Sequence, residues 1–204
     1  MATRRYEQRS RAQAALQTRR RILDAVEERL REAPAERIAV DDIARRAGVS
    51  RSTVYLLFGS RGGLFDAFGL ELVERAGIAS VRDAIANPDP RATVRDGIRA
   101  GAHVYVANRD VLRALFSMAQ LDADAFAGAV ERMLDDRRQH MRRLARRLDE
   151  AGALRPGVAR AQAAHLLWVF TGFEAFDQLY DGQGLGAEAA ADLLVAAAER
   201  SVLA

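Results

Sequence analysis

Cysteine and lysine are absent from this chain of 204 residues, only 4 residues are proline, and aromatic residues make up 6%. Without cysteine there can be no disulfide framework, no cysteine-ligated zinc or iron–sulfur cluster and no thiol nucleophile. No uninterrupted run of about 18 apolar residues is present to span a membrane. The arginine-rich start, residues 1–11, lacks the hydrophobic stretch of a secretory signal peptide. We therefore expect a cytoplasmic protein.

Positive charge is concentrated toward the N-terminus, although the net charge of the whole chain is only +3. Residues 1–65 contain 14 arginines and 8 acidic residues, a balance of +6, whereas residues 66–204 contain 17 arginines and 20 acidic residues, a balance of −3. A GC-rich genome would favour arginine over lysine, so the abundance of arginine carries no functional information. Its uneven distribution does, and it predicts a nucleic-acid-binding N-terminal segment.

Apolar residues recur at helical spacing along most of the chain, and no segment alternates as a strand would, so we expect an all-α fold. Residues 1–17 are polar and are interpreted as a mobile basic arm or a frayed helical extension. The apolar spacing begins at Thr18, and Pro34 ends that first helix. A longer helix is expected from Ser60 to about Ile85. Further helices are expected near residues 91–107, 110–120, 123–151, 158–181 and 187–203.

Two short helices between these segments have the spacing of a helix-turn-helix. Asp41 and Asp42 suit the positive N-terminal end of the first helix. Gly48 can adopt the left-handed backbone that ends it, and Ser50 is a good N-cap for a second helix over residues 51–58. Two helices packed nearly at right angles can place the second in the major groove of DNA, which is about 12 Å wide.

The second short helix separates apolar from polar side chains. Val54, Leu57 and Phe58 are expected to pack on the first helix. The residues left facing outward are Arg51, Ser52, Tyr55 and Leu56. An arginine in the first turn can donate two hydrogen bonds to O6 and N7 of guanine. Taken singly, each outward side chain could also be an ordinary surface residue. Their common register along one helix favours the DNA-binding interpretation.

The segment VDDIARRAGVSRSTVYLLFGSRGGLF, residues 40–65, resembles the signature of the TetR family of transcriptional regulators, and the resemblance runs from Thr18 to Phe68. It implies an N-terminal three-helix helix-turn-helix DNA-binding domain at 18–66, after the basic arm at 1–17. It also implies a helical effector-binding and dimerisation domain at 67–204. The implied function is a repressor that binds a palindromic operator in double-stranded DNA as a dimer and is released by a small, largely apolar ligand.

The resemblance also assigns roles to individual residues. Arg61 would grip a phosphate at the start of the fourth helix. Ala39 and Leu57 depart from the family pattern because neither side chain can bond a phosphate. Gly62 and Gly63 stand where the family usually has an acidic, helix-favouring pair. The first turn of the fourth helix should therefore form less readily, by up to about 1 kcal/mol per glycine relative to alanine. The implied DNA-binding residues are Ser50, Arg51, Ser52, Thr53, Tyr55, Leu56 and Arg61.

The last two expected helices are the candidate dimer surface, because a dimer would present two recognition helices about 34 Å apart to a palindrome. The alternative is that their apolar residues form an ordinary intramolecular core. The small residues that would permit close helix approach are Gly172, Ala175, Ala187, Ala189, Ala190, Ala191, Ala196, Ala197 and Ala198. The larger apolar residues are Phe176, Leu179, Leu193, Leu194, Val195 and Leu203.

Aromatic and methionine side chains in the middle helices are the candidates for an effector cavity. Taken singly, each of them is better explained as a core residue at helical spacing. His103 and Trp168 are preferred because each combines bulk with a polar group. The candidate effector-binding residues are His103, Phe116, Met118, Trp168, Phe170 and Phe173.

Catalysis and cofactor binding find little support in the sequence. The three histidines lie in separate expected helices without the spacing of a helical metal pair, so we expect no metal site. The glycine-rich segment 182–186 lacks the ending of a phosphate loop and is interpreted as a connection. We expect neither an enzyme nor a cofactor. A helical DNA-binding adaptor or architectural protein without a small-molecule effector stays open as the alternative function.

Overall fold

The computed structural model describes residues 2–33, 36–75 and 78–204, and the regular elements in these ranges are all helical. The predicted all-α fold is therefore confirmed for the described part of the chain. Within the same ranges no helix is both long enough and apolar enough to cross a lipid bilayer. The elements are α1 (Ala2–Glu32), α2 (Val40–Arg46), α3 (Arg51–Phe58), α4 (Arg61–Arg75), α5 (Ile78–Ala86), α6 (Pro90–Leu121), α7 (Ala123–Glu150), α8 (Arg160–Phe170), α9 (Phe173–Asp177), a π-helical turn η1 (Gln178–Gly182) and α10 (Ala187–Val202).

The chain divides into two compact units. Unit 1 consists of Met1–Leu72 and Asp110–Glu131, and unit 2 consists of Val73–Arg109 and Arg132–Ala204. The segment expected to form the DNA-binding domain, 18–66, lies wholly in unit 1. Helices α6 and α7 each contribute residues to both units. The expected division of the chain after residue 66 placed these helices wholly in the second domain. The functional division of the chain stays a prediction.

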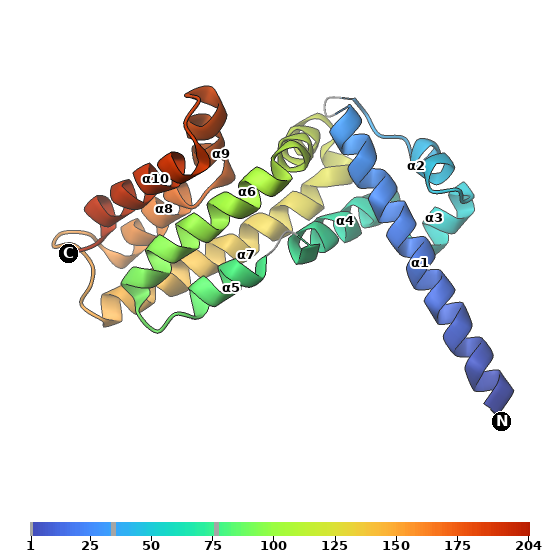
Figure 1. Cartoon of the computed structure of the whole chain (residues 1–204), viewed down its shortest axis with the longest axis horizontal. Coiled ribbons are helices and arrows are strands. Elements are labelled where there is room, and N and C mark those ends of the chain that lie inside the picture. Colours follow the sequence, from blue (N-terminus) through green and yellow to red (C-terminus); the bar gives the residue numbers. More distant parts are fainter. Residues whose placement is uncertain (1, 34–35, 76–77) are drawn as a thin grey trace. The chain divides into compact units, whose positions relative to one another are not determined.

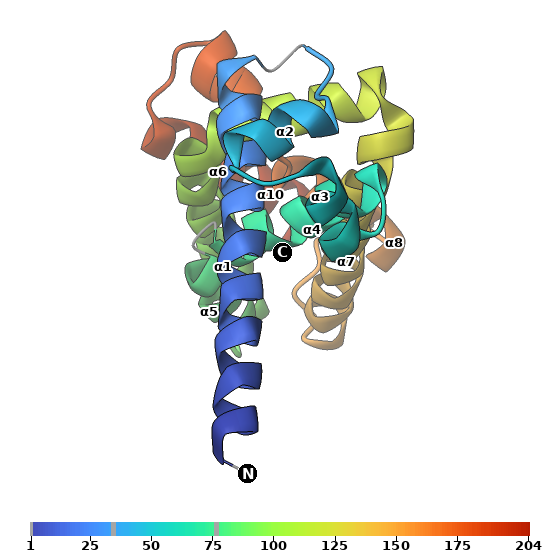
Figure 2. The ribbon, with the colours of Figure 1, turned by 90° about the vertical axis from the view of Figure 1, so that its right-hand side faces the viewer.

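Helix α1 begins at Ala2, not at Thr18 as the apolar spacing predicted. The sequence from 2 to 32 contains neither glycine nor proline and is rich in alanine, arginine, glutamine and glutamate, which are good helix formers. Apolar spacing shows only where a helix is packed, and residues 12–17 are exposed on every side. Figures 1 and 2 show this N-terminal half of α1 extending beyond α2 and α3.

Two other expected boundaries are corrected. The helix expected from Ser60 to Ile85 is two helices, α4 and α5, and residues 76–77 between them lie outside the described residues. The span expected over 158–181 is divided after α8, because Gly172 is extended. Apolar spacing continues through such local changes, so it did not reveal them. The break expected after residue 107 is confirmed as a kink inside α6 at Asn108, whose φ of −121° and ψ of 16° are not helical.

Unit 1 is closed by aromatic and small residues from α1, α4, α6 and α7. The rings of Phe65 in α4 and Phe126 in α7 stack with their centres 3.8 Å apart. Gly69 lets α4 approach α7 closely, because a Cβ atom at this position would lie 3.1 Å from Cβ of Ala129. The largest side chains buried here are Ile22, Leu23, Leu30, Ile38, Ile43, Leu64, Phe65, Phe68, Leu115, Met118 and Phe126.

Unit 2 is built on α8 and α10, which pack side by side (Figure 1). Alanines at 163, 164, 190, 191 and 198 are buried between the helices and permit their close approach. Arg137 of α7 donates a 2.8 Å hydrogen bond to the carbonyl of Trp168 near the C-terminal end of α8, where a cation is favourable. Arg109 pairs with Asp177 and Asp181, both at 2.6 Å, and so ties α6 to the π-helical turn.

Candidate nucleic-acid interface

The turn between α2 and α3 forms as the sequence predicted. Gly48 has a φ of 64°, in the left-handed region that favours glycine. The Oγ of Ser50 accepts a 3.2 Å hydrogen bond from the backbone N–H of Thr53, which caps α3. Asp41 and Asp42 lie in the first turn of α2. The helix-turn-helix geometry is therefore fixed by local interactions.

The outer face of helix α3 carries both polar and apolar side chains. Val54 is 1% exposed and packs inward, whereas Leu56 is 85% exposed. Arg51 and Ser52 are exposed, while Thr53 and Tyr55 are half-buried on the same helix. Phe58, expected in the core, is only half-buried, and the guanidinium carbon of Arg19 in α1 lies 4.9 Å from the centre of its ring.

Hydroxyl groups cluster in the first turn of α3. The Oγ atom of Ser50 lies 2.8 Å from the Oγ of Ser52 and 2.8 Å from the Oγ1 of Thr53. Ser50 therefore acts first as the helix cap, whereas Ser52 and Thr53 keep hydrogen-bonding capacity toward the outside. Such hydroxyls can bond phosphate oxygens or base edges.

Arg51, the first residue of α3, is held by two neighbours. Its Nη1 lies 3.2 Å from Oδ2 of Asp41 in α2, and its Nη2 donates to the Oη of Tyr55 at 3.4 Å. The guanidinium carbon lies 5.4 Å from the centre of the Tyr55 ring. The hydrogen bond with Tyr55, followed by the charge of Asp41, raises the pKa of Arg51, so this side chain stays cationic. The pairing with Asp41 was not foreseen from the sequence.

Arg61, expected to grip a phosphate, instead bonds groups of its own unit. Its Nη2 donates to the backbone oxygen of Ile38 at 2.8 Å and lies 2.6 Å from Oδ2 of Asp122, while Nη1 donates to Oδ1 at 3.1 Å. The Asp122 side chain is only 5% exposed, and that of Arg61 is 32% exposed. In this arrangement Arg61 joins the loop before α2 and the turn between α6 and α7 to α4.

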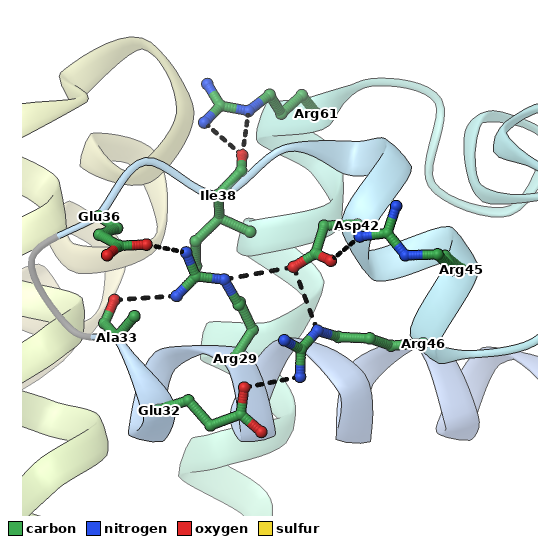
Figure 3. Close-up of polar contacts among 9 residues, drawn as sticks. All are labelled: Arg29, Glu32, Ala33, Glu36, Ile38, Asp42, Arg45, Arg46 and Arg61. Atoms are coloured by element: carbon green, nitrogen blue, oxygen red, sulfur yellow. Dashed lines mark hydrogen bonds and ion pairs between the residues drawn. The ribbon is translucent and has the colours of Figure 1, made fainter.

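A second arginine supports the same loop from α1 (Figure 3). Arg29 donates to the backbone oxygen of Ala33 at 3.1 Å, and it pairs with Glu36 at 2.8 Å and with Asp42 at 3.3 Å. The sequence held a signal for this residue, because Arg29 follows Ile22 by seven positions and Val26 by three, on the buried face of the helix. The network holds α2, and with it the helix-turn-helix, against α1.

Two carboxyl groups in these networks are stabilised as anions. The hydrogen bonds from Arg61, which outweigh the effect of burial, lower the pKa of Asp122. Burial would raise the pKa of Asp42, but the hydrogen bonds and charges of Arg46 and Arg45 outweigh it and lower that pKa as well. Both carboxyl groups are therefore charged at neutral pH.

The predicted effector residues are divided between the two units. Phe116, half-buried, and Met118, fully buried, belong to unit 1. The other four belong to unit 2, so the structure does not bring all six into one unit. The guanidinium of Arg137 covers the half-buried Trp168 ring at 3.6 Å from its centre. Phe173 is 6% exposed, and Phe170 packs against the unit 2 core.

His103 is exposed, and its Nδ1 lies 2.8 Å from the backbone oxygen of Arg99 in its own helix. It lines a surface hollow of about 250 Å³ between α6 and α10. No group of three or more histidine, aspartate or glutamate side chains that could hold a metal ion occurs among the described residues. The other residues of the hollow are Arg99, Ala102, Ala187, Glu188, Ala191 and Asp192.

The proposed dimer residues also divide into two groups. Leu193 of α10 is 46% exposed, and Val169 of the adjacent α8 is 54% exposed, so an apolar surface remains on these two helices. For the buried candidates the alternative of an intramolecular core holds. They are Gly172, Phe176, Ala190, Ala191, Leu194, Val195, Ala198 and Leu203. Ala189 is exposed, and the half-buried candidates are Ala175, Leu179, Ala187, Ala196 and Ala197.

Comparison with known proteins was decisive for the N-terminal segment. Residues 22–68 match the family model described as bacterial regulatory proteins of the tetR family. The match spans the C-terminal part of α1, all of α2 and α3, and the first half of α4. A curated relative, the HTH-type transcriptional regulator AlkX of Mycobacterium tuberculosis, is 43% identical over 54 residues, which are 26% of this chain and 26% of that protein. The chain thus matches about a quarter of that relative's length.

Solved structures of TetR-type proteins share the fold over nearly the whole chain. NalD of Pseudomonas aeruginosa, the secondary repressor of an efflux pump, superposes with a TM-score of 0.73 at 23% identity, covering 94% of this chain and 98% of NalD. SmeT of Stenotrophomonas maltophilia superposes with a TM-score of 0.66 at 19% identity, covering 91% and 90% of the two chains. The chain thus shares the overall fold of these two proteins.

Proposed function

We propose that this protein is a DNA-binding transcriptional regulator of the TetR family that acts in the cytoplasm as a repressor. The observation that carries the proposal is the exposed face of α3, where Arg51, Ser52 and Leu56 project outward from a helix fixed by its cap and turn. The same segment lies within the match to the family model. The repressor role named for NalD supports this direction of regulation.

The groove-facing residues of the proposal are Ser52, Thr53, Tyr55 and Leu56, together with Arg51. Arginine can read guanine, while tyrosine and leucine can contact the methyl group of thymine. Ser50 contributes by capping the helix. The contacts of Arg61 within unit 1 favour a supporting role for this residue over a phosphate contact, which differs from the role implied by the family resemblance.

Selection of bound duplexes from fragmented genomic DNA, followed by binding titrations, tests the proposal. We expect an enriched palindromic site that the Arg51→Ala variant binds at least tenfold more weakly than the parent protein. Loss of binding at high salt but not at low salt would be expected for phosphate contacts. A parent protein that binds no fragment at any salt concentration would contradict the proposed function.

We further propose that the regulator is a homodimer released from DNA by a small, largely apolar effector. The exposed apolar side chains of α8 and α10 support the dimer, and the hollow beside His103 is a starting point for the effector search. A thermal-shift screen separates this from an adaptor protein without an effector, because a specific ligand raises the melting temperature by mass action. A screen without a stabilising ligand would favour the adaptor.

A further inference from the structure

The guanidinium of Arg51, in the proposed reading helix, is held by an acidic side chain from another helix. Asp41 reaches it from the first turn of α2 at 3.2 Å. Tyr55, one helical turn further along α3, accepts a hydrogen bond at 3.4 Å and places its ring beside the guanidinium. Arg51 is thus restrained from two sides before any DNA is bound.

This ion pair does not serve the stability of the fold. The side chains of Arg51 and Asp41 are 59% and 61% exposed, and pairs exposed to this degree contribute little to folding. Arg29 of the same unit differs from Arg51 in this respect, because its side chain is only 10% exposed and it joins α1 to the loop before α2. A pair on the outer surface of a helix-turn-helix is better explained by what that surface binds.

The donor groups of Arg51 fit one base. A guanidinium has five N–H groups, of which one is used by Asp41 and one by Tyr55. Three remain, and guanine accepts two hydrogen bonds, at O6 and N7. A restrained guanidinium loses less conformational entropy on binding than a free one. The pair also disfavours a turn of the guanidinium toward a phosphate, a contact that would carry no sequence information.

We propose that Asp41 is a specificity-determining residue, which holds Arg51 in the orientation for guanine and keeps it off the phosphates. The inference rests on the proposed DNA-binding function. The negative charge of Asp41 also repels the DNA backbone, which weakens binding to unrelated sequences. Neutralising Asp41 should therefore act in two opposite directions: selectivity falls, and affinity for random DNA rises. A residue with a merely structural role would lower both.

Selection from a pool of randomised duplexes tests the inference, because it does not require the operator sequence. The full-length parent protein is compared with Asp41→Asn, Arg51→Ala and Glu28→Gln. Glu28 is exposed on α1, and its variant changes the net charge equally.

We expect Arg51→Ala to abolish guanine preference at one base pair of each half-site. Asp41→Asn should lower that preference about five- to tenfold, within the range of a bidentate arginine contact. Its affinity for random DNA should rise, and Glu28→Gln should keep the preference.

The outcomes distinguish this inference from the proposed function. If Asp41→Asn keeps the guanine preference of the parent, Asp41 does not set specificity, although the protein still binds DNA. If Asp41→Asn weakens binding to all sequences alike, its role is structural and the inference is overturned. If the parent protein enriches no sequence and binds no duplex, the proposed function itself fails. Asp41→Glu, which restores the carboxylate, should recover part of the guanine preference.

Discussion

Single polar side chains decide how the helix-turn-helix is held within unit 1. Arg29 and Arg61 each satisfy a backbone carbonyl and a carboxylate, and both contact the segment that leads into α2. Buried donors and acceptors without partners are costly, so such a network fixes one arrangement of the loop. The orientation of α3 therefore depends on residues that do not face the proposed DNA surface.

Asp122→Asn should destabilise the protein by about 1–3 kcal/mol at neutral pH, because it leaves Arg61 without its carboxylate. The value is below that of a fully buried pair because the Arg61 side chain is 32% exposed. The pKa of Asp122 is lowered from its usual 3.8, so its stabilisation is complete above that pH and is lost as the pH falls further. Urea titrations should show the gap from the parent protein closing below about pH 4.

Asp124→Asn is the matched control, because Asp124 lies two residues further on and is exposed. Its effect should stay within about 0.5 kcal/mol. An Asp122→Asn protein as stable as the parent at pH 7 would show that the pair with Arg61 contributes nothing to folding.

Gly62 and Gly63 should respond in opposite ways to alanine. A Cβ atom at Gly63 would lie 2.2 Å from the backbone oxygen of Phe58, whereas at Gly62 the nearest atom is at 3.6 Å. Gly63→Ala should cost about 2–3 kcal/mol through overpacking. Gly62→Ala should stabilise by up to about 1 kcal/mol through helix propensity. Thermal unfolding of both variants measures the contrast, and equal melting temperatures would contradict it.

At the scale of elements, α1 combines two different helices in one. Residues from Ile22 onward pack into unit 1, whereas residues 12–17 have no packed face. Seven arginines and one acidic residue lie between positions 2 and 21. A short polar helix of this kind gains little stability by itself in water. The exposed residues 12–17 precede Arg19, whose guanidinium carbon lies 4.9 Å from the centre of the Phe58 ring in α3. Arginines in this segment are suited to the phosphates that flank a bound groove.

Replacing Arg4, Arg5, Arg9 and Arg11 by glutamine should reduce the salt dependence of DNA binding. Each phosphate that is no longer neutralised by an arginine lowers the slope of log K against log salt by about 0.9. A variant with Arg138, Arg142, Arg143 and Arg146 of α7 replaced removes the same charge from unit 2 and should keep the slope. Fluorescence anisotropy at several salt concentrations measures both, and equal slopes in all three proteins would argue against contacts by α1.

At the scale of the whole molecule, the proposed function requires two copies. Val169 and Leu193 leave apolar area exposed on the paired helices α8 and α10, whereas most other apolar residues of these helices are already buried within one chain. A contact with a second copy would bury these two side chains and remove their apolar area from water. A second copy is the occupant that the two-fold symmetry of a palindromic site calls for.

Leu193→Glu should convert the protein to a monomer, because a carboxylate would be buried in an apolar interface without a partner. The matched control is Leu70→Glu, an exposed leucine of α4 with an exposed fraction of 55% against 46% for Leu193. Light scattering gives the molar mass of each variant. A Leu193→Glu protein that stays dimeric would place the interface elsewhere.

Local chemistry in the sequence was sufficient for the all-α fold, for the turn with Gly48 and for the cap at Ser50. These features depend on neighbours within a few residues: hydrophobic spacing, a glycine at positive φ and a serine N-cap. A single sequence is therefore sufficient to predict them. The same spacing misplaced the start of α1, because a helix without a packed face has no apolar pattern to follow.

Only the tertiary structure decided the partners of the charged side chains. Arg61 meets Asp122, a residue 61 positions away, and Arg51 meets Asp41 across the turn. An arginine's long side chain reaches groups in any direction, and its sequence position does not say which carboxylate the fold brings near. Residue types and periodicity therefore determine which helices form and which face of α3 is outward. The packing of distant segments determines which arginines are paired with carboxylates within the chain and which remain available for contacts with DNA.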